Sequence, residues 1–410
     1  MSGSMHLQPI FAAMRRNRVG AAVIAVQIAL TLAILCNALF IIQQRLALSA
    51  RPSGTDEPDL FAIANEWVGA AGDPVARVQA DLALLRSLPG VAGAYVTNAY
   101  PLTGSGSTEL LGLDPEKLRA APAAQYFGDE QTLRTLGLRL IAGRNFRAEE
   151  VADLGSFDNP HPAGLIVTQA LARKLFPDGD ALGRGVYYAG QRSTTPIIGI
   201  IAELQVPWTS IGGWGSAWSG SSMVVPFRVV TPSAYYIVRA QPGRLSALMK
   251  SAPRRLVALN HDRVIDGVQS FQQARTAVYR DDRGLAVILA VVCAVLLAVT
   301  AFGIVGLTSY WVAQRRQQIG IRRALGATRA AIVRHFQTEN LIIAAAGGIA
   351  GIALGIGANL WMVSSFATAR LPLIYLLAGV AVVLGLGQLA ALRPALRAAS
   401  VPPAEATRTE

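Results

Sequence analysis

Four long apolar segments contain no charged side chain, and they constrain the fold of this chain more than any other feature. They cover residues 19–42, 285–312, 341–366 and 371–392. A helix needs about 20 mostly apolar residues to cross a bilayer, and each segment reaches that length. The first is too long for the apolar region of a cleavable signal peptide, which has about 7–15 residues. We therefore expect four membrane-spanning helices.

The charged residues divide the chain in the same way. Residues 46–282 hold 22 of the 25 acidic and 22 of the 37 basic residues, so the excess of +12 lies in the flanks. Basic residues near helix ends mark the cytoplasmic side of a membrane. They precede the first helix (Arg15, Arg16 and Arg18), fill the link at 313–337 and follow the fourth helix. Both termini and this link are therefore predicted to be cytoplasmic, with 46–282 outside. The net charge describes membrane orientation and does not indicate nucleic-acid binding.

The segment between the first and second helices is predicted to be a large mixed α/β domain. Its apolar patterns predict helices at 74–88, 168–175 and 245–259 and strands at 91–97, 163–167, 196–202 and 235–239. Both cysteines, Cys36 and Cys293, lie in predicted spans. The domain must therefore be stable through its own core rather than through disulfides.

The stretch 203–225 differs from the rest of this domain. It is rich in Gly, Ser and Trp and shows no period, which predicts a long surface loop. Two interpretations of Trp208, Trp214 and Trp218 stay open. The rings either contact a partner or ligand, or pack onto their own domain.

No catalytic or metal-binding pattern is present in the sequence. The histidines are scattered, and none has a second ligand at metal spacing. There is no G-x-S-x-G nucleophile motif. None of the three lysines follows a glycine, so the sequence contains no Walker A loop for ATP. We expect a non-catalytic protein that holds no metal or cofactor of its own.

The link between the second and third helices has a more specific pattern. It predicts a short helix with apolar residues among arginines, ended at Gly326 by a left-handed cap. Thr328 then caps the next helix, which continues into the third span. Such an elbow can transmit force between a cytoplasmic partner and two membrane helices, whereas the alternative is that the arginines only bind anionic lipid. The candidate coupling residues are Arg315, Arg316, Gln318, Ile319, Gly320, Ile321, Arg322, Arg323, Leu325 and Gly326.

Small and polar residues in the spans predict close helix packing. Gly347, Gly351 and Gly355 recur every four positions in the third span, a pattern that lets two helices approach closely. They serve either packing within one subunit or the contact between two subunits. Gln27 and Thr31 share a face of the first span, where we expect hydrogen bonds between helices.

The elbow sequence resembles the R-x-x-E-I-G-I-R-x-A-x-G-A signature of the MacB/FtsX-like ABC transporter permeases. The resemblance extends over nearly the whole chain and includes segments 138–146, 167–176, 197–201 and 393–403. One position departs from the signature. Gln318 stands where the family has Glu, which removes a negative charge that could pair with an ATPase.

The resemblance implies a division of the chain. Residues 1–45 would be the cytoplasmic N-terminus and first helix, and 46–282 a porter-like periplasmic domain with an inserted subdomain near 126–222. Residues 283–400 would hold three helices with the coupling elbow, and 401–410 a cytoplasmic tail. The expected location is the cytoplasmic (inner) membrane of a bacterium.

The resemblance also implies a permease subunit for export or mechanotransmission. A separate ATPase subunit, present in two copies and binding ATP and Mg²⁺, would dock on the elbow. A second permease chain, identical or homologous, membrane lipid and in some cases a periplasmic adaptor would be further partners. The alternative is a membrane-anchored receptor or assembly factor that signals through the elbow without transport.

Overall fold

The computed structural model describes residues 18–69, 72–114, 121–156, 158, 160–188, 191, 193–208, 220–366 and 369–400. These residues form two compact units. The helical unit contains the described residues up to Leu48 and from Asp281 onward, and the α/β unit is Ser49–Arg280.

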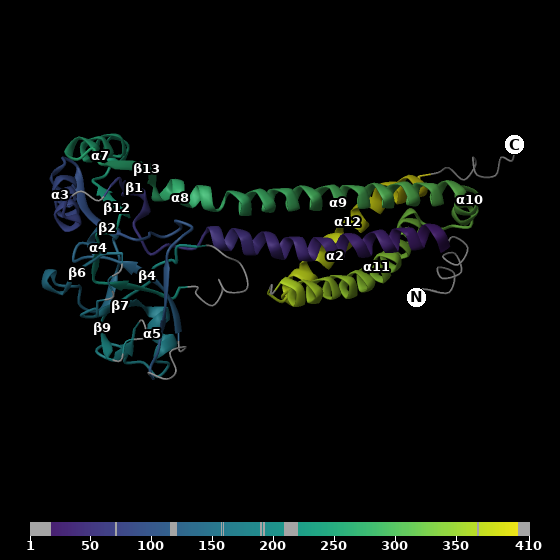
Figure 1. The fold of residues 1–410 in the computed structure, drawn as a ribbon. Helices are drawn as coiled ribbons and strands as arrows, with labels where there is room; N and C mark the ends of the chain where they lie inside the picture. Colours follow the sequence, from purple (N-terminus) through teal and green to yellow (C-terminus); the bar gives the residue numbers. More distant parts are fainter. Residues whose placement is uncertain are drawn as a thin grey trace. The chain divides into compact units, whose positions relative to one another are not determined.

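Among the described residues, four helices of the helical unit are long and apolar enough to cross a membrane. They confirm the four predicted spans, and each runs past its apolar segment at one end or both. Pro372 is the N-cap of the last helix. A short helix, α10, lies between the second and third spans (Figure 1). The bounds are α2 (Arg18–Ser49), α9 (Arg280–Gln314), α10 (Arg316–Ala324), α11 (Arg329–Phe366) and α12 (Leu373–Ala399).

Polar side chains join these helices within their apolar interior. Thr31 of α2 and Thr300 of α9 are hydrogen-bonded, with 2.9 Å between their Oγ1 atoms. The Nδ2 atom of Asn37 on α2 donates to the carbonyl oxygen of Gly355 on α11 at 3.0 Å. In a bilayer such bonds are worth about 0.6–2 kcal/mol each. The first span is therefore tied to both the second and the third, as the polar face of α2 predicted.

As far as the described residues extend, the α/β unit contains a four-stranded antiparallel sheet with the order β13–β1–β12–β2. Two helices cover one face of it (Figure 1). Val78 and Leu82 of α3 pack with Leu248 and Leu256 of α7 over Ile63 of β1. The bounds are β1 (Leu60–Trp67), α3 (Pro74–Ser87), β2 (Val91–Thr97), β12 (Ser233–Ala240), α7 (Leu245–Leu259) and β13 (Arg263–Ser270).

A second, mixed sheet has the order β3–β4–β10–β7–β9–β5, with β8 paired to β9. α5 covers one face through Leu171 and Leu175. β6 (Ala152–Leu154) and β11 (Phe227–Val229) form a separate parallel pair. The remaining bounds are β3 (Ser107–Leu111), β4 (Ala121–Phe127), β5 (Leu140–Gly143), β7 (Leu165–Thr168), α5 (Gln169–Leu175), β8 (Gly185–Tyr187), β9 (Thr194–Ile201) and β10 (Ser222–Val225).

The two sheets share one core. Ile237 of the first sheet belongs to the same buried cluster as Tyr126 and Ile166 of the second. Two short helices add Leu133 and Phe271 to this cluster. The sheets are therefore held together by apolar packing and move as one body unless this core opens. The two helices are α4 (Thr132–Leu136) and α8 (Phe271–Val278), and two 3₁₀ turns are η1 (Glu57–Asp59) and η2 (Ala148–Glu150).

The elements predicted for this domain are present as α3, α5, α7, β2, β7, β9 and β12, with ends shifted by up to two residues. The prediction of a surface loop throughout 203–225 is wrong at its C-terminal end. Ser222–Val225 form β10, which lies between β4 and β7 in the second sheet. All four of its residues are buried. An apolar run of this length is too short to show a period. The predicted inserted subdomain near 126–222 stays a prediction, and the second sheet draws its strands from β3 to β10.

Candidate coupling site

The link between α9 and α11 folds into a short helix with a defined end. Leu325 is the C-cap of α10, and Gly326 follows at φ +93°. The Gly326 N–H donates to the Arg323 carbonyl oxygen at 3.1 Å, and the Ala327 N–H donates to that of Arg322 at 3.0 Å. These two bonds form a Schellman motif, in which glycine is favoured because it adopts positive φ without strain. The predicted left-handed cap at Gly326 is confirmed.

The third span begins directly after this cap. The Oγ1 atom of Thr328 accepts a hydrogen bond from the Ala331 N–H at 3.2 Å, as predicted for an N-cap. From Arg329 the helix continues without interruption to Phe366. The last part of the link, residues 329–337, is therefore the first part of α11, so a displacement of these residues also moves the span.

A buried ion pair fixes the end of the second span to the third. The Nη1 atom of Arg315 lies 2.9 Å from Oε2 of Glu339, and its Nη2 atom lies 3.2 Å from Oε1. The two side chains are 17% and 2% exposed. Two parallel bonds of this kind define both distance and orientation. Glu339 was not predicted as a site residue, although a lone acid beside an uncharged span is a usable signal.

Apolar packing holds α10 against two spans. Ile319 is buried in a cluster with Ile332 and Phe336 of α11 and with Ala395 and Ala398 of α12. Gly320 is also buried. The inner face of the elbow therefore consists of Arg315, Ile319 and Gly320. On this face Arg315 is bound to Glu339.

The opposite face of α10 is open to solvent. Ile321 is 48% and Leu325 83% exposed. Gln318 and Arg322 are exposed at the edge of this face, where they also border the space between α10 and α11. Exposed apolar side chains next to cationic ones are typical of a protein contact surface. This outer face therefore has the composition of a docking surface for another chain.

A pocket of about 140 Å³ lies between α10 and the start of α11. Arg315, Gln318, Arg322 and His335 supply its polar lining. Of the described residues that line it, none is acidic. The pocket therefore favours an acidic or hydrogen-bond-accepting group over a basic one.

The predicted glycine stripe of the third span faces α2 of the same chain. A Cβ atom on Gly347 would lie 2.6 Å from the carbonyl oxygen of Ala25, and one on Gly351 2.9 Å from that of Ala29. Gly355 is less tightly packed, with Ala33 at 3.5 Å. These three glycines thus contact the first span of the same chain. Of the two predicted roles, packing within one subunit and contact between two subunits, this contact fits the first.

The tryptophans of the 203–225 stretch are only partly described. Trp208 packs against the core shared by the two sheets. Trp214 and Trp218 lie outside the described residues. For Trp208 the packing interpretation fits the structure, and the elbow is the stronger candidate site.

Four apolar helices, an α/β unit between the first and second, and a basic elbow between the second and third define a multi-span membrane protein of the permease type. The chain belongs to the MacB/FtsX-like permease family of ABC transporters. Residues 21–255 match the family of the MacB-like periplasmic core domain, and residues 290–403 match the FtsX-like permease C-terminal family.

Curated relatives agree with this assignment. The chain is 29% identical over 343 residues to the macrolide export ATP-binding/permease protein MacB 1/2 of Paracoccus denitrificans, covering 80% of this chain and 47% of that protein. It is 25% identical to the corresponding MacB of Chromobacterium violaceum, covering 55% and 34%. It is 27% identical to an uncharacterized ABC transporter permease, YknZ, of Bacillus subtilis, covering 67% and 66%. The chain spans about a third to a half of the length of these two MacB relatives.

Solved structures show a weaker likeness. The periplasmic region of MacB from Actinobacillus actinomycetemcomitans matches with a TM-score of 0.35 and 14% identity, over 57% of this chain and 97% of that one. The extracellular domain of the transporter YknZ from Gram-positive bacteria matches with a TM-score of 0.32 and 16% identity, over 51% and 99%.

Proposed function

We propose that this chain is the membrane subunit of an ABC transporter that carries ATP-driven motion from its elbow to its α/β unit. A separate ATPase subunit binds ATP and Mg²⁺, docks on the outer face of α10 and is present in two copies. A second permease chain, identical or homologous, completes the complex. The termini and elbow face the cytoplasm of a bacterium, and the α/β unit lies outside the inner membrane.

The observation that carries this proposal is the attachment of the elbow on its inner face and its exposure on the outer face. Arg315 binds Glu339, and Ile319 packs on α11 and α12. Ile321 and Leu325 remain exposed. A partner that moves α10 therefore moves the ends of two spans with it, which a lipid anchor does not require.

The motion has a route through the helical unit. α11 contacts α2 through the glycine stripe, and α2 contacts α9 through Thr31 and Thr300. α2 and α9 are the helices that continue into the α/β unit. The apolar segments contain no charged residue that would mark a polar path between the helices. The work is therefore delivered to the α/β unit, for export or for mechanical signalling.

Affinity purification of the tagged chain from its native membranes tests the first step. We expect a chain with a Walker A motif to copurify, and reconstitution with this chain in nanodiscs to stimulate its ATPase activity. If no such chain is recovered, the receptor or assembly-factor alternative replaces the transporter.

Charge reversal on the outer face tests the docking site. Arg322→Glu should reduce ATPase stimulation by about tenfold, because a charge at a docking surface governs association. Arg370→Glu is the matched control, since Arg370 is an exposed arginine in the segment between α11 and α12. Unchanged stimulation by Arg322→Glu would refute the elbow assignment.

A further inference from the structure

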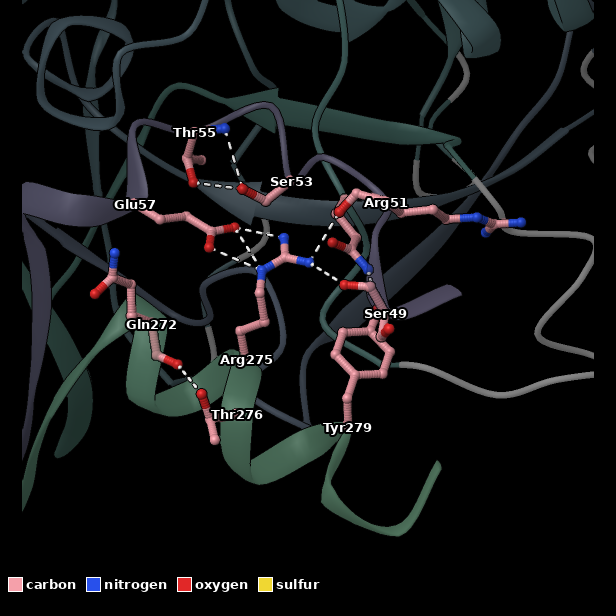
Figure 2. Close-up of polar contacts among 10 residues, drawn as sticks. Ser49, Arg51, Ser53, Thr55, Glu57, Gln272, Arg275, Thr276 and Tyr279 are labelled. Carbon is pink, nitrogen blue, oxygen red and sulfur yellow. Dashed lines mark hydrogen bonds and ion pairs between the residues drawn. The ribbon is translucent and has the colours of Figure 1, made fainter. Parts of the chain in front are cut away.

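The chain enters the α/β unit after α2 and leaves it through α8. One side chain of α8 binds the segment through which the chain enters. α2 ends at Ser49, and the segment that follows it leads to η1, whereas α8 precedes α9. Arg275 of α8 lies between this segment and the η1 turn that follows it (Figure 2). We call Arg275, Glu57 and the carbonyl groups of Ser49 and Arg51 the junction clamp.

The hydrogen bonds of the junction clamp use each nitrogen of the Arg275 guanidinium. Nε lies 2.8 Å from Oε2 of Glu57, and Nη2 lies 2.5 Å from Oε1. Nη1 donates to the carbonyl oxygens of Arg51 at 2.9 Å and Ser49 at 3.1 Å. The side chains of Arg275 and Glu57 are 16% and 15% exposed. Only a planar, forked cation can satisfy the carboxylate and the two carbonyls together, so lysine is not an equivalent residue.

The same junction reaches the core of both sheets. Phe271 and Ala274 of α8 are buried in the cluster that the sheets share. On the other side, Tyr279 is buried, and its hydroxyl accepts a hydrogen bond from Nε2 of Gln205 at 2.8 Å. The backbone N–H of Gln205 donates to the Ser53 carbonyl oxygen at 2.9 Å. The segment after α2, the segment after β9 and α8 are therefore joined.

Gly54 shows how closely these segments approach. It has a φ of +81°, and a Cβ atom at this position would overlap the carbonyl group of Glu203. Any other residue would push the segment after α2 away from the segment after β9. The electrostatics agree with this geometry. Burial opposes ionisation of Glu57, but hydrogen bonds from Arg275 and Ser53 and the charge of Arg275 outweigh it, so its pKa is lowered.

We infer that Arg275 and Glu57 are positioning residues for transmission, because they hold the segments that follow α2 and precede α9 together at the edge of the α/β unit. When a force displaces one segment, the clamp makes the core shared by the two sheets follow. Without it, the seven residues between Ser49 and Glu57 can extend and absorb the displacement locally. This inference rests on the proposed function.

A measurement without ATP tests the clamp itself. In the full chain in nanodiscs, Arg275→Gln should make hydrogen exchange at residues 50–56 faster by about tenfold or more, because charge-assisted bonds are lost. Arg275→Lys should not restore protection. Arg144→Gln is the matched control: its arginine makes two bonds to Glu150 on the surface of the same unit and holds no backbone carbonyl of residues 49–51. Parental exchange in Arg275→Gln would overturn the inference.

A distance measurement tests transmission. Spin labels at Thr108→Cys and Val287→Cys, with Cys36 and Cys293 replaced by alanine, report the α/β unit relative to α9. In the parent, with the copurified ATPase, ATP and vanadate should shift the distance distribution. Arg275→Gln should lose most of this shift while ATPase activity stays at the parental level, and Arg144→Gln should keep it. Glu57→Gln serves if Arg275→Gln folds poorly, and it should lose part of the shift.

The outcomes separate the two proposals. If the parent shows no shift, the proposed function fails. If the parent shifts and both clamp variants shift equally, the junction clamp is structural only and this inference fails.

Discussion

Gly351 of α11 lies against the main chain of α2 at Ala29, so closely that a Cβ atom on Gly351 would be 2.9 Å from the Ala29 carbonyl oxygen. Cβ atoms almost never approach a backbone oxygen at that distance. The contact shows why a small residue is needed here: the two helices pack backbone to backbone, which is the closest approach that membrane helices make.

Gly351→Leu should therefore push α11 away from α2. Overpacking of this kind costs about 1–3 kcal/mol, so we expect a lower melting temperature in detergent and a lower yield of folded protein. Gly348→Leu is the matched control, because a Cβ atom on Gly348 has no atom within 4 Å. Equal melting temperatures for the two variants would show that the glycine contact does not stabilise the helical unit.

The Arg315–Glu339 pair offers a second test. Glu339→Gln removes the charge but keeps the shape, and it leaves Arg315 unpaired in a site where only 17% of its side chain is exposed. Breaking a buried pair in this way costs about 3–5 kcal/mol, whereas replacing both partners by apolar residues costs much less. The double variant Arg315→Met with Glu339→Met should therefore melt at a higher temperature than Glu339→Gln alone. The reverse order would mean that the pair is not effectively buried.

A third test concerns a buried ion pair in the α/β unit. The Nη2 atom of Arg263 lies 2.7 Å from Oδ1 of Asp81, and the Tyr236 hydroxyl donates to Oδ2 of the same carboxylate at 2.5 Å. Asp81→Asn should destabilise the unit by about 3–5 kcal/mol, because Arg263 stays buried and charged. Urea unfolding of the full chain, followed by the intrinsic fluorescence of its six tryptophans, measures this. Asp73→Asn is the control. Asp73 is the exposed N-cap of α3, the helix that also carries Asp81, and asparagine caps a helix equally well.

The parts of this fold that are predictable from the sequence are those with a local signal. The spans are apolar over at least one bilayer width, α7 has a clear helical period, and Gly326 with Thr328 marks the elbow. The strands β1 and β13 were not predicted. Leu60 of β1 pairs with Arg239 and Phe61 with Ser270, so these strands are defined by partners that lie far away in the sequence. β10 was missed because its three apolar residues, at 223–225, are too few to show a period.

The same limit applies to the site. Arg315, Ile319 and Arg322 were predicted as coupling residues because they stand in one short segment. Glu339 lies 24 positions from Arg315 and approaches it only because Gly326 turns the chain back. The junction clamp is even less accessible to sequence reasoning, because Glu57 and Arg275 are 218 positions apart and two of the five bonds end on backbone oxygens.

The depressed pKa of Glu57 predicts a pH dependence. Its pKa is lower in the folded chain than the unfolded value of about 4.3, so the folded state favours the carboxylate. The stabilisation by the Arg275 pair is then complete above that value and is lost as the pH falls below it. We expect Glu57→Gln to flatten the decline of unfolding free energy between about pH 5 and pH 3. A Glu57→Gln variant that follows the parental curve would show that Glu57 does not gain stability from Arg275.

The orientation of the chain is tested by two single cysteines. Thr108 lies exposed on β3 of the α/β unit, and Gln317 lies exposed on α10. The native Cys36 and Cys293 are buried within α2 and α9, so background labelling should be low. A membrane-impermeant maleimide added to spheroplasts should label Thr108→Cys and not Gln317→Cys, and inverted vesicles should give the opposite result. This follows from the arginines at 315–334, because cationic residues near short loops are retained on the cytoplasmic side during insertion. Labelling of Gln317→Cys from outside would place the elbow away from cytoplasmic ATP, and an ATPase subunit could not dock there.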